Sequence, residues 1–190
     1  MKYFKYIMIT LLIVQAGNLY AQKKGSNFGL KNAVIVGQFD KQEDRYSVEA
    51  SLTDLFNGMG VKAMPSLNLV KVGQDAASLA SDSIMAIAEA KGYDTYVIIN
   101  VRGYDRKFRL STAKLTLKEA LERGSLYSIY QENIVSVTFE FRVYRNGEFV
   151  GVDSIKCGNV GERDSVFKRL RSSVEKRLKK QWRKSKSARN

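Results

Sequence analysis

The sequence predicts an α/β (α+β) fold, in which helices pack on a mixed sheet of about five strands. In the first half, short apolar runs alternate with amphipathic segments in the order β-α-β-α-β, which is typical of parallel strands joined by right-handed crossovers. In the second half, two alternating segments flank an Asn-Gly pair, and a long helical pattern follows. We expect a single domain over residues 22–183, preceded by a segment 1–21 and followed by a basic, disordered tail 184–190.

The first parallel unit begins with an apolar run at residues 33–39, the pattern of a strand that is covered on both faces. An amphipathic helix follows, and Gly58 and Gly60 mark its end. A second strand starts at residues 61–64 and stops at Pro65, the only proline in the chain. The apolar stripe of the helix consists of Val48, Leu52, Leu55, Phe56 and Met59.

The second helix of this half is expected to run from Asp75, a potential N-cap, through Lys91, with Gly92 as its terminator. Residues 93–101 then have the pattern of another buried strand. The polar and basic stretch at 103–115 predicts a long loop or an edge strand.

A short helix is expected at residues 117–123, because Thr116 and Glu119 have the spacing of a capping box. Helical pattern could resume past this point to residue 130. Alternating apolar residues from 135 to 143, followed by Asn146 and Gly147, predict a β-hairpin. A long C-terminal helix is predicted by an apolar residue at every fourth position: Val166, Leu170, Val174, Leu178 and Trp182.

The first 21 residues have the features of a secretory signal peptide. Lys2 and Lys5 form a positive region, residues 7–14 are apolar apart from Thr10, and Ala21 is a small residue at the cleavage position. The alternative is a membrane anchor, for which the apolar stretch falls short of the roughly 20 residues a spanning helix needs. We expect an exported protein, periplasmic or associated with the outer membrane. No cysteine stands at the cleavage site, so no lipid anchor and no transmembrane segment is expected in the mature chain.

The composition excludes several classes of catalytic site. The chain contains no histidine, which removes Ser-His-Asp and Cys-His catalysis and His-ligated zinc. Cys157 is the only cysteine, so no internal disulfide can form, and its strand-like surroundings favour a buried, inert thiol. No phosphate-binding glycine motif is present, and we expect no catalytic residue, no bound cofactor and no metal site.

The positive charge is concentrated in the last segment of the chain. Residues 162–190 hold twelve Lys or Arg and three Asp or Glu, against a net charge of +13 for the whole chain. Three interpretations remain open: a solvated helix face, a surface for an anionic lipid, lipopolysaccharide or acidic envelope protein, and nucleic acid, against which export argues. The residues predicted to contact a partner are Lys168, Arg169, Arg171, Lys176, Arg177, Lys179, Lys180, Trp182 and Arg183.

A local motif in the first half resembles a group of bacterial envelope modules. Arg45 and Glu49 on the first helix precede Gly60, a short strand and Ser66. In this order the chain resembles the N-terminal module of the TolB translocation protein and the periplasmic module of the curli-secretion lipoprotein. The resemblance covers about residues 31–101, and it implies an α/β fold in an exported protein; pore formation does not carry over.

Arg45 and Glu49 stand four residues apart and beside the apolar stripe, which predicts a semi-buried structural ion pair. A candidate ligand site follows from a general property of open α/β sheets, which bind ligands at the carboxyl ends of their parallel strands. Asp40, Ser66, Arg102 and Asp105 occupy those ends.

The sequence as a whole favours a non-enzymatic exported binding or assembly module of the bacterial cell envelope. The alternative is a small carboxylate-dependent enzyme or metal-binding domain that uses Asp40 and Asp105. The identity of the partner and the oligomeric state are left open by the sequence.

Export makes a direct prediction about the N-terminus. Protein recovered from the envelope of its native host should begin at Gln22 or within a few residues of it, as measured by mass spectrometry of the intact chain. Recovery of the chain from the cytoplasm with Met1 in place would contradict the signal-peptide interpretation.

Overall fold

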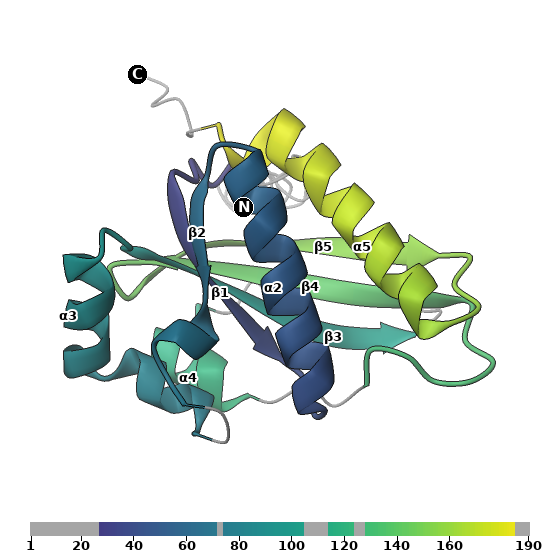
Figure 1. Cartoon of the computed structure of the whole chain (residues 1–190), viewed down its shortest axis with the longest axis horizontal. Helices are drawn as coiled ribbons and strands as arrows, with labels where there is room; N and C mark the ends of the chain where they lie inside the picture. Colours follow the sequence, from purple (N-terminus) through teal and green to yellow (C-terminus); the bar gives the residue numbers. More distant parts are fainter. Residues whose placement is uncertain (1–26, 72–73, 105–113, 124–127, 185–190) are drawn as a thin grey trace, which may run out of the picture.

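A computed structural model describes residues 27–71, 74–104, 114–123 and 128–184 of the chain. Its strands form one five-stranded sheet in the order β2-β1-β3-β4-β5 (Figure 1). β1 pairs in parallel with β2 and β3, whereas β4 is antiparallel to both β3 and β5. The predicted mixed sheet is confirmed, with β1 at Asn32–Gln38, β2 at Lys62–Pro65, β3 at Thr95–Tyr104, β4 at Ser136–Arg145 and β5 at Glu148–Gly158.

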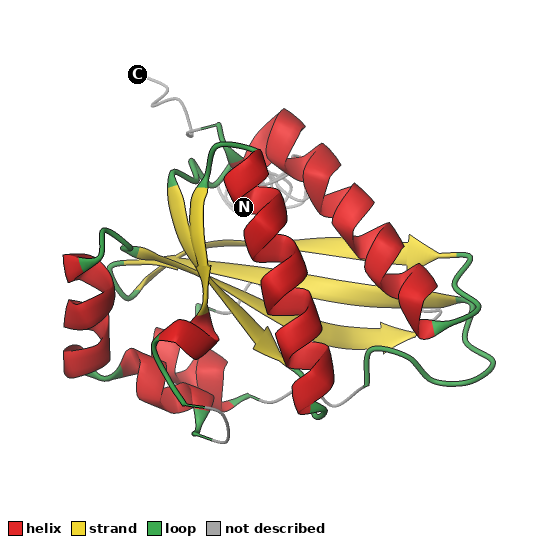
Figure 2. Cartoon of the chain, viewed as in Figure 1, coloured by secondary structure: helices red, strands yellow, loops and turns green. Residues whose placement is uncertain are grey.

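The helices divide between the two faces of this sheet. α2 (Gln42–Gly58) and α5 (Arg163–Arg177) run across one face of the sheet (Figure 2). Their apolar residues form one buried cluster with apolar side chains of the strands. The opposite face packs with α3 (Asp82–Ala90) and α4 (Leu117–Glu122), which close a second, smaller apolar cluster. The sheet therefore has a core on each side, as expected for strands covered on both faces.

α2 follows the predicted pattern closely. Val48, Leu52 and Phe56 are at most 1% exposed, so the apolar stripe lies against the sheet. The helix ends where Gly60 adopts a φ of 75°, a left-handed conformation that favours glycine. The chain then returns directly into β2, beside β1.

The second predicted helix is split in two, which corrects the expectation of one helix from Asp75 to Lys91. A 3₁₀ turn, η3 (Ala76–Ala80), comes first, and the Asp75 carboxylate caps it by accepting from the N–H of Ala77 at 2.9 Å. Ser81 then has an extended backbone, with φ −74° and ψ 143°, and both its N–H and its hydroxyl donate to the carbonyl of Ser78. Because Ser81 closes this turn, α3 starts afresh at Asp82.

The middle of the chain confirms the capping box and extends the third strand. Thr116 and Glu119 each bond the other's backbone N–H, and α4 follows. The alternative of a helix that continues to residue 130 is not supported at 128–130, which are not helical, while 124–127 lie outside the described residues. β3 continues to Tyr104 through an irregularity in its register with β4 at Gly103, and residues 105–113 lie outside the described residues.

The predicted hairpin is present between β4 and β5. Asn146 and Gly147 have φ angles of 50° and 77°, the pair of positive values that a type I′ turn requires. The antiparallel register runs from the pair Arg145 and Glu148 to the pair Ser136 and Gly158.

The long C-terminal helix is confirmed and ends in a π-helical turn, η4 (Leu178–Trp182). All five residues of the predicted stripe are buried. Trp182 is fully buried between Phe28 and Phe141, at ring distances of 5.6 and 5.0 Å, and its indole N–H donates to Asp153 Oδ2 at 2.9 Å. Trp182 therefore belongs to the core, which corrects its assignment to the partner-contact surface.

Trp182 makes a testable prediction about stability. Trp182→Ala should lower the free energy of unfolding by about 3–5 kcal/mol, because it empties a buried site that two aromatic rings line. Urea unfolding followed by circular dichroism measures this change. Tyr46→Ala is the matched control, since the Tyr46 side chain is exposed and its removal should change stability by less than about 0.5 kcal/mol. Equal, small effects of the two substitutions would contradict the packing of η4.

Candidate functional site

Arg45 and Glu49 on α2 are in contact with each other. Arg45 Nε lies 3.0 Å from Glu49 Oε1, and the Glu49 side chain is completely buried. The same oxygen accepts from the N–H of Gly37 at 2.9 Å and from the Ser66 hydroxyl at 2.7 Å. Glu49 Oε2 accepts from the N–H of Leu67 at 3.3 Å. The carboxylate thus joins α2 to the ends of β1 and β2, and we propose that its role is structural.

The predicted ligand-site residues are not brought together. Ser66 bonds Glu49, and it also accepts from Arg45 Nη2 at 2.8 Å. Arg102 points into a different cluster, where it binds Glu140. Asp40 is exposed after β1, and Asp105 lies outside the described residues, so the proposed carboxylate pair has no described geometry.

The basic residues of α5 fall into two rows, one on each side of its buried stripe. The row toward α2 is engaged within the protein: Arg171 donates to the Ser51 carbonyl and hydroxyl, and Lys179 lies 2.5 Å from the carboxylate of Glu175. The hydrogen bond from Lys179 lowers the pKa of Glu175. Arg171 therefore ties α5 to α2, whereas Lys179 forms an exposed pair within its own helical segment.

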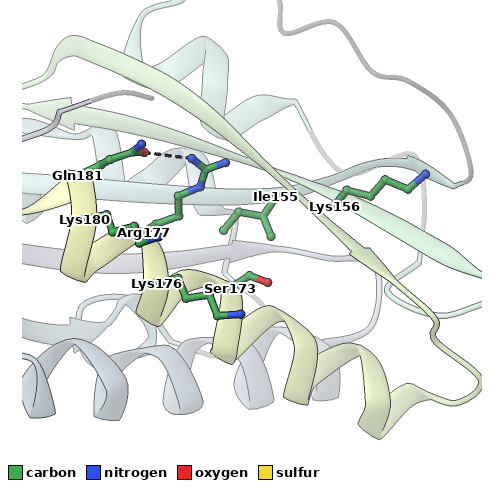
Figure 3. Close-up of a pocket in the computed structure, with 7 residues that line it drawn as sticks. All are labelled: Ile155, Lys156, Ser173, Lys176, Arg177, Lys180 and Gln181. Carbon is green, nitrogen blue, oxygen red and sulfur yellow. Dashed lines mark hydrogen bonds between the residues drawn. The ribbon is translucent and has the colours of Figure 1, made fainter. Parts of the chain in front are cut away.

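The row toward β5 lines a groove between α5 and the last strand (Figure 3). The groove has a volume of about 290 Å³. Lys176, Arg177 and Lys180 supply its cationic side chains, and none of its lining residues is a carboxylate. Lys156 borders the groove on β5, but its side chain points away from these three (Figure 3), because its neighbours Ile155 and Cys157 face the core beneath α5. Its lining residues are Ile155, Lys156, Ser173, Lys176, Arg177, Lys180 and Gln181. We call this feature the basic groove.

Arg177 is the fixed cation of the basic groove. Its Nη1 donates to Gln181 Oε1 at 3.0 Å, the bond drawn in Figure 3, and its Nε lies 3.5 Å from Asp153 Oδ2. Lys156, Lys176 and Lys180 are exposed, and the described residues offer them no ion pair. A ligand in the groove would therefore meet one oriented guanidinium and the two adaptable ammonium groups of Lys176 and Lys180.

A second hollow lies along the same seam, which is the line of contact between α5 and the end of β5. Its charges balance differently from those of the groove. Its volume is about 540 Å³, and it includes Lys168 and Arg169 together with Glu162 and Asp164. Two cations and two carboxylates leave it without net charge. The uncompensated charge of the seam therefore lies at the C-terminal half of α5, where cations also stabilise the negative end of the helix dipole.

Sequence reasoning missed a pair of charged residues on β4. Glu140 and Arg142 were given no role, yet both are buried on the face opposite α2 and α5. A charged pair two residues apart within a strongly apolar strand was the available signal.

Burial raises the pKa values of Tyr96, Tyr144 and Cys157. Desolvation raises the pKa of the Cys157 thiol to about 12, so this cysteine is protonated and unreactive at neutral pH, as its strand context predicted. Desolvation also raises the pKa of the Tyr144 hydroxyl, and the charge of Arg142 opposes part of that shift. Within the ranges that the structure describes, no group of three or more potential metal ligands occurs, and no helix is long and apolar enough to span a bilayer.

Comparison with known proteins shows a likeness of fold at low sequence identity. The PelC dodecamer from Paraburkholderia phytofirmans matches with a TM-score of 0.44 and 13% identity, over 80% of this chain and 92% of that chain. Lipoprotein GNA1162 from Neisseria meningitidis matches with a TM-score of 0.40 and 16% identity, over 78% of this chain and 96% of that chain. No protein-family model and no curated protein sequence matches the chain. The narrower resemblance to the TolB and curli-secretion modules has no family match behind it.

The contact between Arg45 and Glu49 leads to a prediction about the stability of the domain. Arg45→Ala should destabilise the domain, and Glu49→Ala should cost about 3–5 kcal/mol, since it strands the guanidinium and leaves several donors unpaired. The double substitution should cost less than the sum of the two, which a double-mutant cycle of urea melts measures. Strict additivity would mean that the two side chains do not interact.

Proposed function

We propose that the protein is a non-enzymatic, exported binding module of the bacterial cell envelope that attaches to the phosphate groups of anionic lipid or lipopolysaccharide. The observation that carries this proposal is the basic groove, where the exposed side chains of Lys176 and Lys180 flank Arg177 and have no ion pair among the described residues. Lipid and lipopolysaccharide phosphates are the anions that an exported protein meets at a membrane surface, and their attraction for a basic residue near the surface is about 1 kcal/mol each.

The arrangement of the two chain ends supports a membrane surface as the partner. The N–H groups of Gly29 and Leu30 donate to the carbonyls of Lys184 and Trp182, each at 2.9 Å. Arg145 Nη2 donates to the carbonyls of Phe28 and Gly29, at 3.0 and 3.1 Å. The segment that follows the expected signal peptide is therefore bonded to the end of the basic helix.

This junction has a consequence under either interpretation of the first 21 residues. If they are cleaved, the mature chain starts seven residues before Gly29, which is bonded to Lys184 at the end of the basic helix. If they remain as an anchor, the bonds of Gly29 and Leu30 favour a position of that basic end next to the bilayer.

A charge-reversal pair tests the proposal. Lys176→Glu with Lys180→Glu should weaken binding to vesicles that contain anionic phospholipid by about tenfold or more, because each lysine supplies roughly 1 kcal/mol near such a surface. Co-sedimentation at two salt concentrations measures the change, and binding of the unmodified chain should fall as salt rises. Both lysines are exposed, so the fold should be retained.

The matched control changes the same charge elsewhere. Lys91→Glu with Lys118→Glu alters two exposed lysines outside the groove, and it should reduce vesicle binding by a factor of about two or less. If both pairs weaken binding equally, the attraction is a property of net charge and not of the groove. If the unmodified chain binds no anionic vesicle at low salt, the proposal fails and an acidic envelope protein becomes the next partner to test.

A further inference from the structure

The face of the sheet away from α2 and α5 carries a cluster of buried polar side chains. The strand register aligns Gln38 with Asn100, and Asn100 with Glu140, across β1, β3 and β4. Arg142 and Tyr144 follow on the same face of β4. All five side chains are at most 6% exposed. We call these five residues the buried polar cluster.

The cluster and its neighbour Arg102 together hold one more positive than negative charge. Arg142 Nε lies 2.6 Å from Glu140 Oε1, and Arg102 approaches the same oxygen through Nε at 3.0 Å and Nη2 at 2.5 Å. One carboxylate thus faces two guanidinium groups. Arg142 is 1% exposed and Glu140 is fully buried, whereas the Arg102 side chain is 22% exposed and reaches water.

Several polar atoms of the cluster have no partner among the described residues. They include both Nη atoms of Arg142, the second carboxylate oxygen Glu140 Oε2, the amide oxygen of Asn100 and the hydroxyl of Tyr144. Buried polar atoms in folded proteins are nearly always paired, and an unpaired guanidinium is among the costliest exceptions. Donors and acceptors stand next to each other here, so a ligand that satisfies both must itself carry acceptors and a donor.

We propose that the buried polar cluster binds inorganic phosphate in a protonated form. Phosphate oxygens accept from the two Arg142 Nη atoms in the planar, two-pronged geometry that suits a guanidinium. A phosphate hydroxyl donates to Glu140 Oε2 or to the amide oxygen of Asn100, and the negative charge of the ion cancels the excess positive charge. Burial of the cluster restricts it to a small ion.

Glu140 gives the site a selectivity that the basic groove lacks. Phosphate keeps at least one proton at neutral pH, whereas sulfate keeps none and has nothing to donate to Glu140 Oε2. The unpaired carboxylate oxygen therefore repels sulfate while it accepts from phosphate. The lysines of the groove offer only donors, so they attract the two anions alike. This inference is independent of the proposed function of the groove.

Calorimetric titration of the complete secreted chain with sodium phosphate and with sodium sulfate, at equal ionic strength, tests the inference. We expect phosphate to bind at least about tenfold more tightly than sulfate, the discrimination that loss of one hydrogen bond to a charged group produces. The variant Lys176→Glu with Lys180→Glu should show the same preference, which separates this site from the groove.

Two substitutions locate the site. Tyr144→Phe keeps the ring that packs on Phe149, at 5.6 Å, and removes only the unpaired hydroxyl, so the variant should fold and bind phosphate a few-fold to about tenfold more weakly. Arg142→Lys should weaken phosphate binding by about tenfold or more, because an ammonium group lacks the two-pronged donor. Circular dichroism confirms that each variant is folded.

Three results would overturn the inference. The first is equal binding of phosphate and sulfate by the unmodified chain, and the second is binding of neither, in which case buried water serves the unpaired atoms. The third is a phosphate preference that a folded Tyr144→Phe variant retains at full strength, since the ion then lies elsewhere.

Discussion

The position of α5 depends on one buried row of apolar side chains that ends at Trp182. Val166, Leu170 and Val174 seat the helix on the sheet, and η4 extends the row until the indole closes over Phe28 and Phe141. Because this row faces inward, every charged residue of the helix must lie on one of its two flanks. The flank toward α2 is used internally, and the flank toward β5 forms the basic groove. The packing of the core therefore decides which charges a partner can reach.

Much of the fold follows from periodicity, which is a local property of the sequence. The stripe of α2, the Asn146 and Gly147 turn and the row that ends at Trp182 each need only neighbouring residues to be recognised. The break at Ser81 was not predicted, because it depends on Ser81 hydrogen bonds that compete with the helix. Trp182 was expected on the contact surface, but it is buried. The π-helical turn keeps it in line with the apolar stripe of α5.

The candidate sites were harder to predict, because they depend on residues that are distant in the sequence. The basic residues of the last helix were evident in the sequence, but the side on which each one lies depends on the positions of α2 and β5. Glu49 was expected to pair with Arg45, yet its bonds to Gly37 and Leu67 follow from the strand ends that the sheet brings together. Polar residues of β4 alternate as on a solvated face, and only the register with β3 reveals them as buried.

The central claim is that the flank of α5 toward β5 is the contact surface, and lysine acetylation measured with and without anionic vesicles tests it most directly. Lysine amines that a membrane covers react more slowly, and mass spectrometry assigns each rate to a residue. The account predicts that Lys176 and Lys180 lose reactivity together in the presence of vesicles, while the exposed Lys91 and Lys118 do not. Protection centred on Lys91 or Lys118, or equal rates at all four lysines, would contradict it.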